Sequence, residues 1–474
     1  MTFTARLKRN LIGDRHFYRQ VITILIPVII QNTVTHVVNL VDNIMVGSIG
    51  TLEMSAVAIV NQLLFVFNLC IFGGLSGAGI FTSQFAGANN LEGVRHTFRI
   101  KLYIALGVSA IAVGVFSLAP NSLISMYLSE NTSAADASAT LGFGLDYLYI
   151  MLLGLIPFAI SQLYGSTLRE LGETKLPMIA SVVAIFINIT LNYILIYGNK
   201  GLSLLPFAPM GVVGAAIATV FSRYVEMAVI LITVHKNKEK YPFIKGAYSS
   251  FKIPITLCKE IAKKGLPLLI NEFLWSFGMA SLMQCYSVRG IEVVAATNIT
   301  TTAGNLFNVL YFSMGTAIAI MCGQHLGAGR TAEAKTTVWR LLALSVAGCI
   351  AVGSVLFAIA PIIPQIYNTS DSVKQLASEL LRIFSLLMPF CAFCHGCYFA
   401  MRSGGKTIVT MIFDSGFIWM VSFPVAYIIA HFTSLPILPF YLIVQGVEIV
   451  KSIISGILIN KNFWINNIVN NKEN

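Results

Sequence analysis

Long apolar stretches separated by short polar segments run along the whole chain, and this pattern predicts its fold. Each stretch is long enough to cross a hydrocarbon layer roughly 30 Å thick, which takes about 20 helical residues. Lipid offers no hydrogen bonds to the backbone, so spanning segments are helices or strands of closed barrels, and barrel strands alternate over about ten residues. We therefore predict an all-α polytopic membrane protein with twelve transmembrane helices, near residues 20–46, 54–83, 101–120, 139–167, 177–198, 211–234, 265–287, 294–323, 341–363, 376–400, 407–430 and 437–459.

Lysine and arginine are concentrated in every second polar segment. The basic segments are Arg6–Arg19, Arg95–Lys101, Arg169–Lys175, Lys236–Lys264, Arg330–Arg340 and Arg402–Lys406. The alternate segments hold little more than Lys200, Arg289 and Lys374. Because cytoplasmic loops carry the excess of basic residues, both termini of this multi-pass protein are predicted to lie on the cytoplasmic side of the cell membrane. The alternation also supports the count of twelve, since a missed span would invert every later loop.

The chain repeats itself at an offset of about 240 residues. Gln84-Phe-Ala-Gly87-Ala88 recurs as Gln324-His-Leu-Gly327-Ala328, and Pro27 and Gln31 align with Pro267 and Asn271. Further along, Arg169 aligns with Arg402 at an offset of 233. We expect two six-helix lobes related by this repeat, with a substrate site between the repeats. The predicted parts are a cytoplasmic N-terminal segment (1–19), the first lobe (20–234), a basic cytoplasmic linker (235–264), the second lobe (265–459) and a cytoplasmic tail (460–474).

Composition agrees with this membrane assignment and excludes several other classes. The chain is 56% hydrophobic and 11% charged, and its mean hydropathy is +0.78. The net charge of +11 lies in short segments between apolar runs, so it indicates topology and not a nucleic-acid partner. The basic start leads into a span too long for a cleavable signal peptide. No phosphate loop, nucleophile elbow or water-facing metal motif is found, so we expect no enzyme activity, no cofactor, and a monomer in the bilayer.

Eight cysteines are present, most of them inside apolar stretches, so disulfides are not expected. One cluster, Cys391-Ala-Phe-Cys394-His395-Gly-Cys397, contains the C-x-x-C-H spelling of haem attachment. It lies within a predicted span without evident aqueous access. We interpret it as a helix contact built from small residues rather than as a haem or metal site.

Polar residues recur along one side of the first span. Asn32, Thr35, Asn39 and Asp42 follow one another at spacings of three and four, and Gln31 and His36 lie beside them. An acid inside hydrocarbon costs several kcal/mol, so it is a functional hypothesis by default. Asp42 is predicted to bind a cation or proton, and the other five residues are candidates for lining a substrate cavity. The alternative is a hydrogen-bond network that packs helices.

The fifth and sixth spans supply predicted partners for Asp42. Asn188 and Asn192 are one turn apart, and Thr219 lies in a small-residue segment that allows close helix approach. Sodium prefers several oxygen ligands, which one carboxylate with amide and hydroxyl oxygens would provide. A proton needs only Asp42. The residues leave both coupling ions open.

Acids also occur in the second half. Glu272 and Asp414 each lie about two turns inside a predicted span and are candidates for a second cation or proton site. Glu272 is close enough to the membrane surface to snorkel, and Asp414 could instead cap a helix or pair with a loop lysine. Glu226 and Glu448, near the ends of their spans, are expected to be interface residues.

Several of these segments resemble the multidrug and toxic compound extrusion (MATE) family. They are Val41-Asp42-Asn-Ile-Met45-Val-Gly47, Gln84-Phe-Ala-Gly87-Ala88, Leu168-Arg169-Glu-Leu-Gly172-Glu-Thr174-Lys175, Gly211-Val-Val-Gly214-Ala215-Ala216-Ile-Ala218-Thr219 and Gly323-Gln324-His-Leu-Gly327-Ala328-Gly329. The resemblance extends in order from about residue 15 to residue 460. It implies two lobes around a central cleft and the export of cationic or amphipathic organic compounds in exchange for sodium ions or protons. It also implies a cation site at Asp42, Asn188, Asn192 and Thr219.

Two positions depart from the family pattern. Asn192 stands where several members of the family have an aspartate, which moves the expectation slightly toward protons. Glu272 matches a helix-seven glutamate found in some bacterial relatives, but span ten lacks their aspartate, so Asp414 is at most a substitute. One alternative function is a lipid-linked precursor flippase of the same superfamily, although such a protein typically has a cleft richer in arginine. The other is a membrane channel or receptor.

Overall fold

The structure is a computed structural model, and residues 11–128, 133–201 and 208–469 are described. The side chains of residues 38–40 and 200 are outside this description. The ends of the predicted N-terminal segment and of the predicted tail, 1–10 and 470–474, also lie outside the described residues.

Eleven of the described helices are long and apolar enough to cross a membrane. In addition, α6 (Ala134–Leu152) and α7 (Leu155–Glu170) form a pair bent by 48°, which raises the count to twelve if the pair is one span. The bend lies where Gly154 precedes Pro157, and Pro157 has no N–H to continue the hydrogen bonds of α6. The prediction of an all-α membrane protein is confirmed, and its fourth span, 139–167, is this bent pair.

Contacts divide the chain into two compact units. Unit 1 consists of Met1–Ile29, Ser83–Asn90 and Glu260–Asn474, and unit 2 consists of Ile30–Thr82 and Leu91–Lys259. The helices α2 (Arg15–Gly47) and α3 (Thr51–Gly87) each contribute residues to both units.

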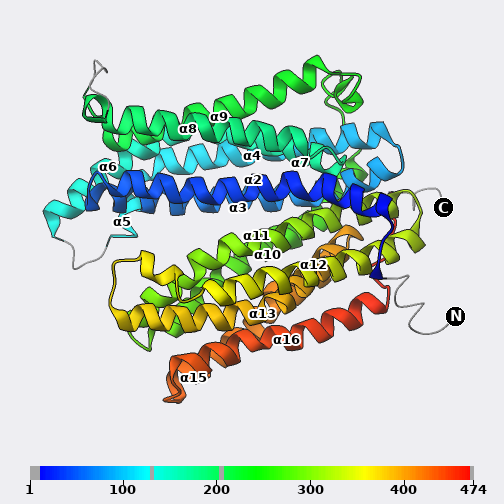
Figure 1. Cartoon of the computed structure of the whole chain (residues 1–474). Helices are drawn as coiled ribbons and strands as arrows, with labels where there is room; N and C mark the ends of the chain where they lie inside the picture. Colours follow the sequence, from blue (N-terminus) through cyan, green and yellow to red (C-terminus); the bar gives the residue numbers. More distant parts are fainter. Residues whose placement is uncertain (1–10, 129–132, 202–207, 470–474) are drawn as a thin grey trace. The chain divides into compact units, whose positions relative to one another are not determined.

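Unit 2 contains the predicted spans three to six. After α2 and α3 come α4 (Leu91–Leu118), α5 (Pro120–Ser125), α6, α7, α8 (Lys175–Gly201), α9 (Gly211–Lys236) and the short 3-10 helix η1 (Pro242–Ile244). α9 packs against α6, α7 and α8, and α4 packs against α7 (Figure 1). A Cβ atom at Gly214 of α9 would lie 2.7 Å from the backbone of Leu195 on α8, so glycine is what lets these two helices approach so closely.

The segment predicted as a basic linker is partly folded onto unit 2. Phe243 is fully buried, and Arg99 of α4 donates hydrogen bonds to Gly246 O (2.8 Å) and Ala247 O (2.9 Å). Lys240 lies 2.7 Å from Glu173, and this carboxylate raises the pKa of the Lys240 ammonium. Helix α10 already begins at Ile255, ahead of the predicted start at 265. The linker is thus a docked segment rather than a free tether.

Unit 1 is built around one central helix. Its helices are α10 (Ile255–Ser287), α11 (Ile291–Gly327), α12 (Thr331–Ile359), η2 (Ile363–Ile366), α13 (Asp371–Ser403), α14 (Thr407–Met411), η3 (Ile412–Gly416), η4 (Ile418–Ser422), α15 (Phe423–Phe432) and α16 (Ile437–Asn460). α13 packs against α11, α12 and α16, as Figure 1 shows. Two of the short elements, η3 and η4, are π-helical and interrupt the eleventh span.

Arg289, one of the few basic residues in the sparsely charged loops, has a structural partner. Its guanidinium donates to the backbone oxygens of Ile429 (2.8 Å), Ala430 (2.9 Å), Thr433 (2.8 Å) and Leu435 (3.0 Å). The last carbonyls of a helix lack partners within the helix. Arg289 therefore caps the end of α15, which explains a positive charge that runs against the topology pattern.

The two copies of the sequence repeat at residues 84 and 324 contact each other within unit 1. A Cβ atom added at Gly87 would lie 1.9 Å from Gln324 O, and one at Gly327 would lie 1.8 Å from Gln84 O. The ends of α3 and α11 thus cross backbone to backbone, which only glycine permits. This contact explains why both copies of the repeat have glycine at this position.

The segment after α16 is packed against the same place. Trp464 is 1% exposed, and its carbonyl oxygen lies against Gly404. The Gln84 amide donates to Ser403 O (2.9 Å) and Asn466 O (3.1 Å), and its oxygen accepts from Ile468 N (2.9 Å). Gln84 therefore joins the end of α3 to the end of α13 and to the C-terminal segment.

Candidate functional site

The predicted partners of Asp42 gather around it in unit 2. Asn192 Nδ2 donates to Asp42 Oδ1 at 2.7 Å and also lies 3.2 Å from Asn188 Oδ1. Asn188 Nδ2 lies 3.4 Å from Thr219 Oγ1 on α9. Asn188 and Asn192 are buried, at 4% and 1% exposed, whereas Asp42 is half-buried. One carboxylate, two amides and one hydroxyl thus form a compact cluster between α2, α8 and α9.

The Asn188 amide has two chemically distinct orientations. The atom that faces Asp42 lies 3.0 Å from Oδ1 and 3.2 Å from Oδ2. With nitrogen there, Asn188 donates to an ionised carboxylate. With oxygen there, Asn188 accepts from Asn192 and donates to Thr219, and the facing oxygens of Asn188 and Asp42 need a proton or a cation between them. The cluster therefore suits both a charged and a neutralised Asp42.

Sequence reasoning missed Tyr147, which extends this cluster toward α6. Its hydroxyl lies 3.4 Å from Asn61 Oδ1, and it interacts electrostatically with Asp42 and Arg223. Tyr147 is 4% exposed. A single tyrosine in an apolar span is not part of a periodic polar pattern. Its position beside the Asp42 cluster is therefore evident only from the fold.

Two further candidates on α2, Gln31 and Thr35, have partners away from Asp42. Gln31 Nε2 donates to Ser181 Oγ (2.8 Å), which donates to Glu226 Oε1 (2.6 Å), forming a second polar chain. Thr35 donates to Gln31 O of its own helix (2.8 Å). Gln31 precedes Asp42 by eleven residues, about 16 Å along a helix.

The other three candidates on α2 are Asn32, His36 and Asn39. Asn32 is half-buried and His36 is exposed only in part, while the side chain of Asn39 is outside the described residues. Glu226, which we expected at the membrane interface, is instead enclosed between α8 and α9, with Arg223 and Arg169 acting on it electrostatically.

In unit 1, Asp414 accepts a hydrogen bond from Asn271, the residue that precedes Glu272. Asn271 Nδ2 donates to Asp414 Oδ2 (3.1 Å), and Asn271 Oδ1 accepts from Ser415 N (3.3 Å) and Ser415 Oγ (2.5 Å). Glu272 interacts electrostatically with Asp414 and with Arg402. The structure thus brings the two predicted acids of the second half into one charged region.

Sequence reasoning missed the cation in this region. Lys451 Nζ on α16 lies 3.4 Å from Asp414 Oδ1 and 3.5 Å from Glu448 Oε1, and the residue is 6% exposed. Glu448, which was expected to be an interface residue, instead pairs with the buried ammonium of Lys451. The available signal was Glu448 and Lys451, a pair of opposite charges three residues apart inside an apolar span.

The polar chains of the two units occupy equivalent repeat positions. The offset of 240 pairs Gln31 with Asn271, and the offset of 233 that pairs Arg169 with Arg402 also pairs Ser181 with Asp414. Gln31 contacts Ser181, and Asn271 contacts Asp414. By contrast, the repeat position of Asp42 is Leu282, so the Asp42 cluster has no counterpart in the second half.

The cysteine cluster of α13 packs against α16. Cys394 Sγ lies 3.2 Å from Ser452 Oγ, and the His395 ring lies among Tyr311, Phe312 and Phe399, with ring centroids 4.9–5.2 Å away. The eight cysteines are free thiols. Over the described part of the chain, no three His, Cys, Asp or Glu side chains gather in a way that could hold a metal ion.

The chain matches the MatE family over residues 27–194 and 267–428, which is more than half of its length. It belongs to the MatE family. The family is one of membrane transporters, so this protein is a multi-pass transporter and not an enzyme. The predicted family resemblance is therefore confirmed.

Relatives match over most of their length. A probable multidrug resistance protein, NorM, of Thermotoga maritima is 25% identical over 420 residues, covering 89% of this chain and 87% of that protein. A Bacillus anthracis protein of the same name is also 25% identical, covering 88% and 89%.

Solved structures share the fold. An outward-facing multidrug resistance MATE transporter has a TM-score of 0.83 at 21% identity, covering 97% of this chain and 99% of that one. A Vibrio cholerae MATE transporter has a TM-score of 0.84 at 17% identity, covering 94% and 97%.

Proposed function

We propose that this MatE transporter exports amphipathic or cationic organic compounds and takes up protons in exchange, with Asp42 as the coupling residue. The observation that carries the proposal is the Asp42 cluster itself. A single half-buried carboxylate is surrounded by neutral amides and a hydroxyl, with Asn192 2.7 Å away. Charge buried without a full counter-charge is costly, so binding a cation or proton there changes the energy of the site. The name of the relatives, probable multidrug resistance protein, supports the substrate class.

The hydrogen bonding favours a proton over sodium. Asn192 presents its N–H, not its oxygen, to the carboxylate. A sodium ion at Asp42 would need oxygen ligands from Asn188, Asn192 and Thr219, so the Asn192 amide would have to turn over. A proton on Asp42 requires no such change of Asn192, which can keep donating to Oδ1.

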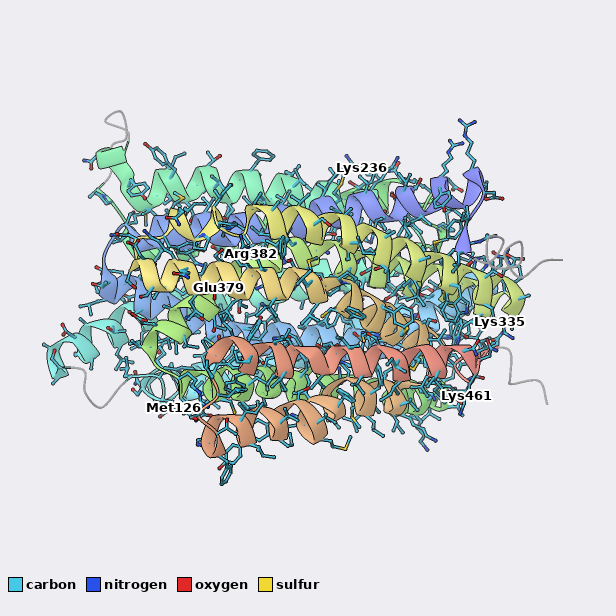
Figure 2. All side chains as sticks on the ribbon, turned by 60° about the horizontal axis from the view of Figure 1, so that its bottom comes forward. Met126, Lys236, Lys335, Glu379, Arg382 and Lys461 are labelled. Atoms are coloured by element: carbon cyan, nitrogen blue, oxygen red, sulfur yellow. The ribbon has the colours of Figure 1, made fainter. Side chains whose placement is uncertain are left out.

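Alternating access follows if the two ligands favour different arrangements of the protein. Proton binding stabilises one arrangement and the organic substrate another, and each shifts the balance only by its difference in affinity for the two. We place both termini in the cytoplasm of a cell membrane and treat the chain as a monomer. Figure 2 shows the basic residues Lys335 and Lys461 at the same end of the unit 1 helices. Glu379 and Arg382, in the first half of α13, lie toward the other end. The grouping of Lys335 and Lys461 supports this orientation, because basic residues are concentrated on the cytoplasmic side.

Reconstituted protein in liposomes tests the proposal. A proton gradient imposed without sodium is expected to drive ethidium transport, and a sodium gradient at equal pH on both sides is expected to drive little. The reverse result would assign the coupling to sodium. Transport under neither gradient would remove the antiport proposal.

A further inference from the structure

We propose that Asp414 and Glu448 form a binding site for the positively charged group of an organic substrate, and that Lys451 is the resident cation which this group displaces. The proposal rests on the export function above and names where in unit 1 the substrate's charge is recognised. It assigns roles to Glu448, which was expected to be an interface residue, and to Lys451, which the sequence did not single out.

The geometry is that of a cation shared between two carboxylates at long hydrogen-bond distances. The ammonium of Lys451 lies 3.4 Å from Asp414 and 3.5 Å from Glu448. Strong charge-assisted hydrogen bonds are shorter, about 2.7–2.9 Å. The lysine side chain is 8% exposed, whereas both carboxylate side chains are 22% exposed. Each acid therefore keeps a partly exposed side chain beside the buried lysine.

The charges do not balance within the trio. Two carboxylates face one ammonium, which leaves one excess negative charge in a membrane-spanning region. Glu272 interacts electrostatically with Asp414 and Arg402, and His395 interacts with Asp414, Lys451 and Arg402. Cys391, Cys394 and Tyr311 are the other titratable groups that interact with Glu448. A second cation entering here would meet this excess negative charge, while Asp414 keeps its hydrogen bond from Asn271.

The surroundings suit an organic cation better than a metal ion. Lys451 Nζ lies 5.6 Å from the ring centre of Phe413 and 5.9 Å from that of Phe417. Aromatic faces attract cations, and they do so without supplying the several oxygen ligands that sodium needs. A substrate that carries a positive charge on an apolar body would contact both the acids and the rings.

The backbone around Asp414 departs from a regular α-helix. Asp414 lies in the π-helical turn η3, and Asn271 fixes it through hydrogen bonds to the Asp414 carboxylate and to Ser415. Single π-helical turns interrupt α-helices mainly at functional sites. The repeat-equivalent position in unit 2 is Ser181, an uncharged residue, so this charged site is particular to the second half.

Equilibrium binding of ethidium to purified protein in lipid nanodiscs tests the proposal without a gradient. Asp414→Asn and Glu448→Gln are expected to weaken ethidium binding about tenfold each, which is about 1.4 kcal/mol. Lys451→Gln is expected to strengthen binding by a similar factor, because it removes the competing cation. Lys451→Arg keeps the charge and is expected to bind ethidium within about twofold of the wild type. It is the second variant to measure if Lys451→Gln does not fold.

Matched controls carry the same charge changes elsewhere in unit 1. Glu379→Gln on α13 and Lys461→Gln after α16, both labelled in Figure 2, are expected to leave ethidium binding unchanged. The neutral dye Nile red is expected to bind all variants equally. Equal effects in the controls, the same direction of change for Asp414→Asn and Lys451→Gln, or parallel changes with Nile red would overturn the proposal. Because ethidium binding is measured at equilibrium and without a gradient, failure of the coupling proposal remains distinguishable from failure of this one.

Discussion

Asn192 donates a 2.7 Å hydrogen bond from α8 to the carboxylate of Asp42 on α2. The two residues are 150 positions apart in the chain, and the bond places an amide where a second acid would create a doubly charged site. This pairing makes Asp42 the single titratable acid of its cluster and leads to the first two predictions.

Replacing Asp42 by asparagine is expected to abolish gradient-driven efflux, because the side chain can then no longer gain and lose a charge. The amide is nearly the same size, so the variant should still insert and purify as a single species. Ethidium efflux from proteoliposomes measures the loss. Asp371→Asn is the matched control, since the Asp371 side chain is fully exposed and should tolerate the change. Full efflux by Asp42→Asn would remove Asp42 from the mechanism.

Replacing Asn192 by aspartate is expected to introduce sodium dependence. The variant has two carboxylates at the site, and hard cations such as sodium are held better by charged oxygen ligands. Efflux at fixed pH, measured against sodium concentration, should rise in Asn192→Asp and stay flat in the wild type. Asn237→Asp, at the exposed end of α9, is the control. A flat response in both proteins would contradict this account of the Asn192 substitution.

Replacing Glu272 by glutamine is expected to impair coupling, seen as a flatter dependence of efflux on pH between about pH 6 and pH 8. The physical reason is that Glu272 is half-buried and interacts with both Asp414 and Arg402, so its charge affects the whole region. Glu239→Gln, with a side chain that is 91% exposed, provides the comparison. An unchanged pH profile would give Glu272 a structural role only.

The ion pair between Lys101 and Glu170 is expected to be a stability element of unit 2. Lys101 is fully buried in α4 and also contacts Thr167 Oγ1 at 3.4 Å. Lys101→Met should cost about 3 kcal/mol or more, because it leaves a mostly buried carboxylate without its charged partner. Thermal unfolding in detergent measures the loss, and Lys101→Met with Glu170→Gln should recover most of it. No recovery in the double variant would mean that packing, not charge, dominates.

The crossing of Gly87 and Gln324 predicts a steric penalty. Gly87→Ala would place a Cβ atom 1.9 Å from a backbone oxygen, so the helix ends must separate. Overpacking of this kind typically costs about 1–3 kcal/mol and more when backbone must move. Gly107→Ala has nothing within 4 Å of its Cβ and should be neutral or slightly stabilising in the same unfolding measurement. A loss of stability in Gly107→Ala equal to that in Gly87→Ala would contradict the steric argument.

The sequence predicted the fold and the neutral partners of Asp42, because both depend on regular spacing. Apolar run lengths and loop charges gave the spans, and Asn188 and Asn192 shared a helix face one turn apart. Tyr147, Lys451 and Glu226 were not predictable in the same way. Tyr147 carries no periodic signal, and the pair of Glu448 and Lys451 does not reveal its third member, Asp414. The role of each residue depends on which helix packs beside it.

The sequence also misjudged some charges near helix ends. Lys101 was counted as a loop residue, but it is fully buried inside α4. Arg289 and Glu448 likewise have defined partners in unit 1. Position relative to a predicted boundary does not reveal such partners, since a long side chain can turn inward as easily as outward.

The docked segment after α16 has a practical consequence for handling the protein. Trp464 and Ile468 are held by the ends of α3 and α13 through Gln84 and Gly404, so residues 462–469 belong to the folded body. An affinity tag or fluorescent fusion joined directly after Asn460 would replace these contacts and leave the Gln84 amide to find new partners. A fusion joined after Asn474 preserves them, and this position is therefore the appropriate junction for expression and imaging of the transporter.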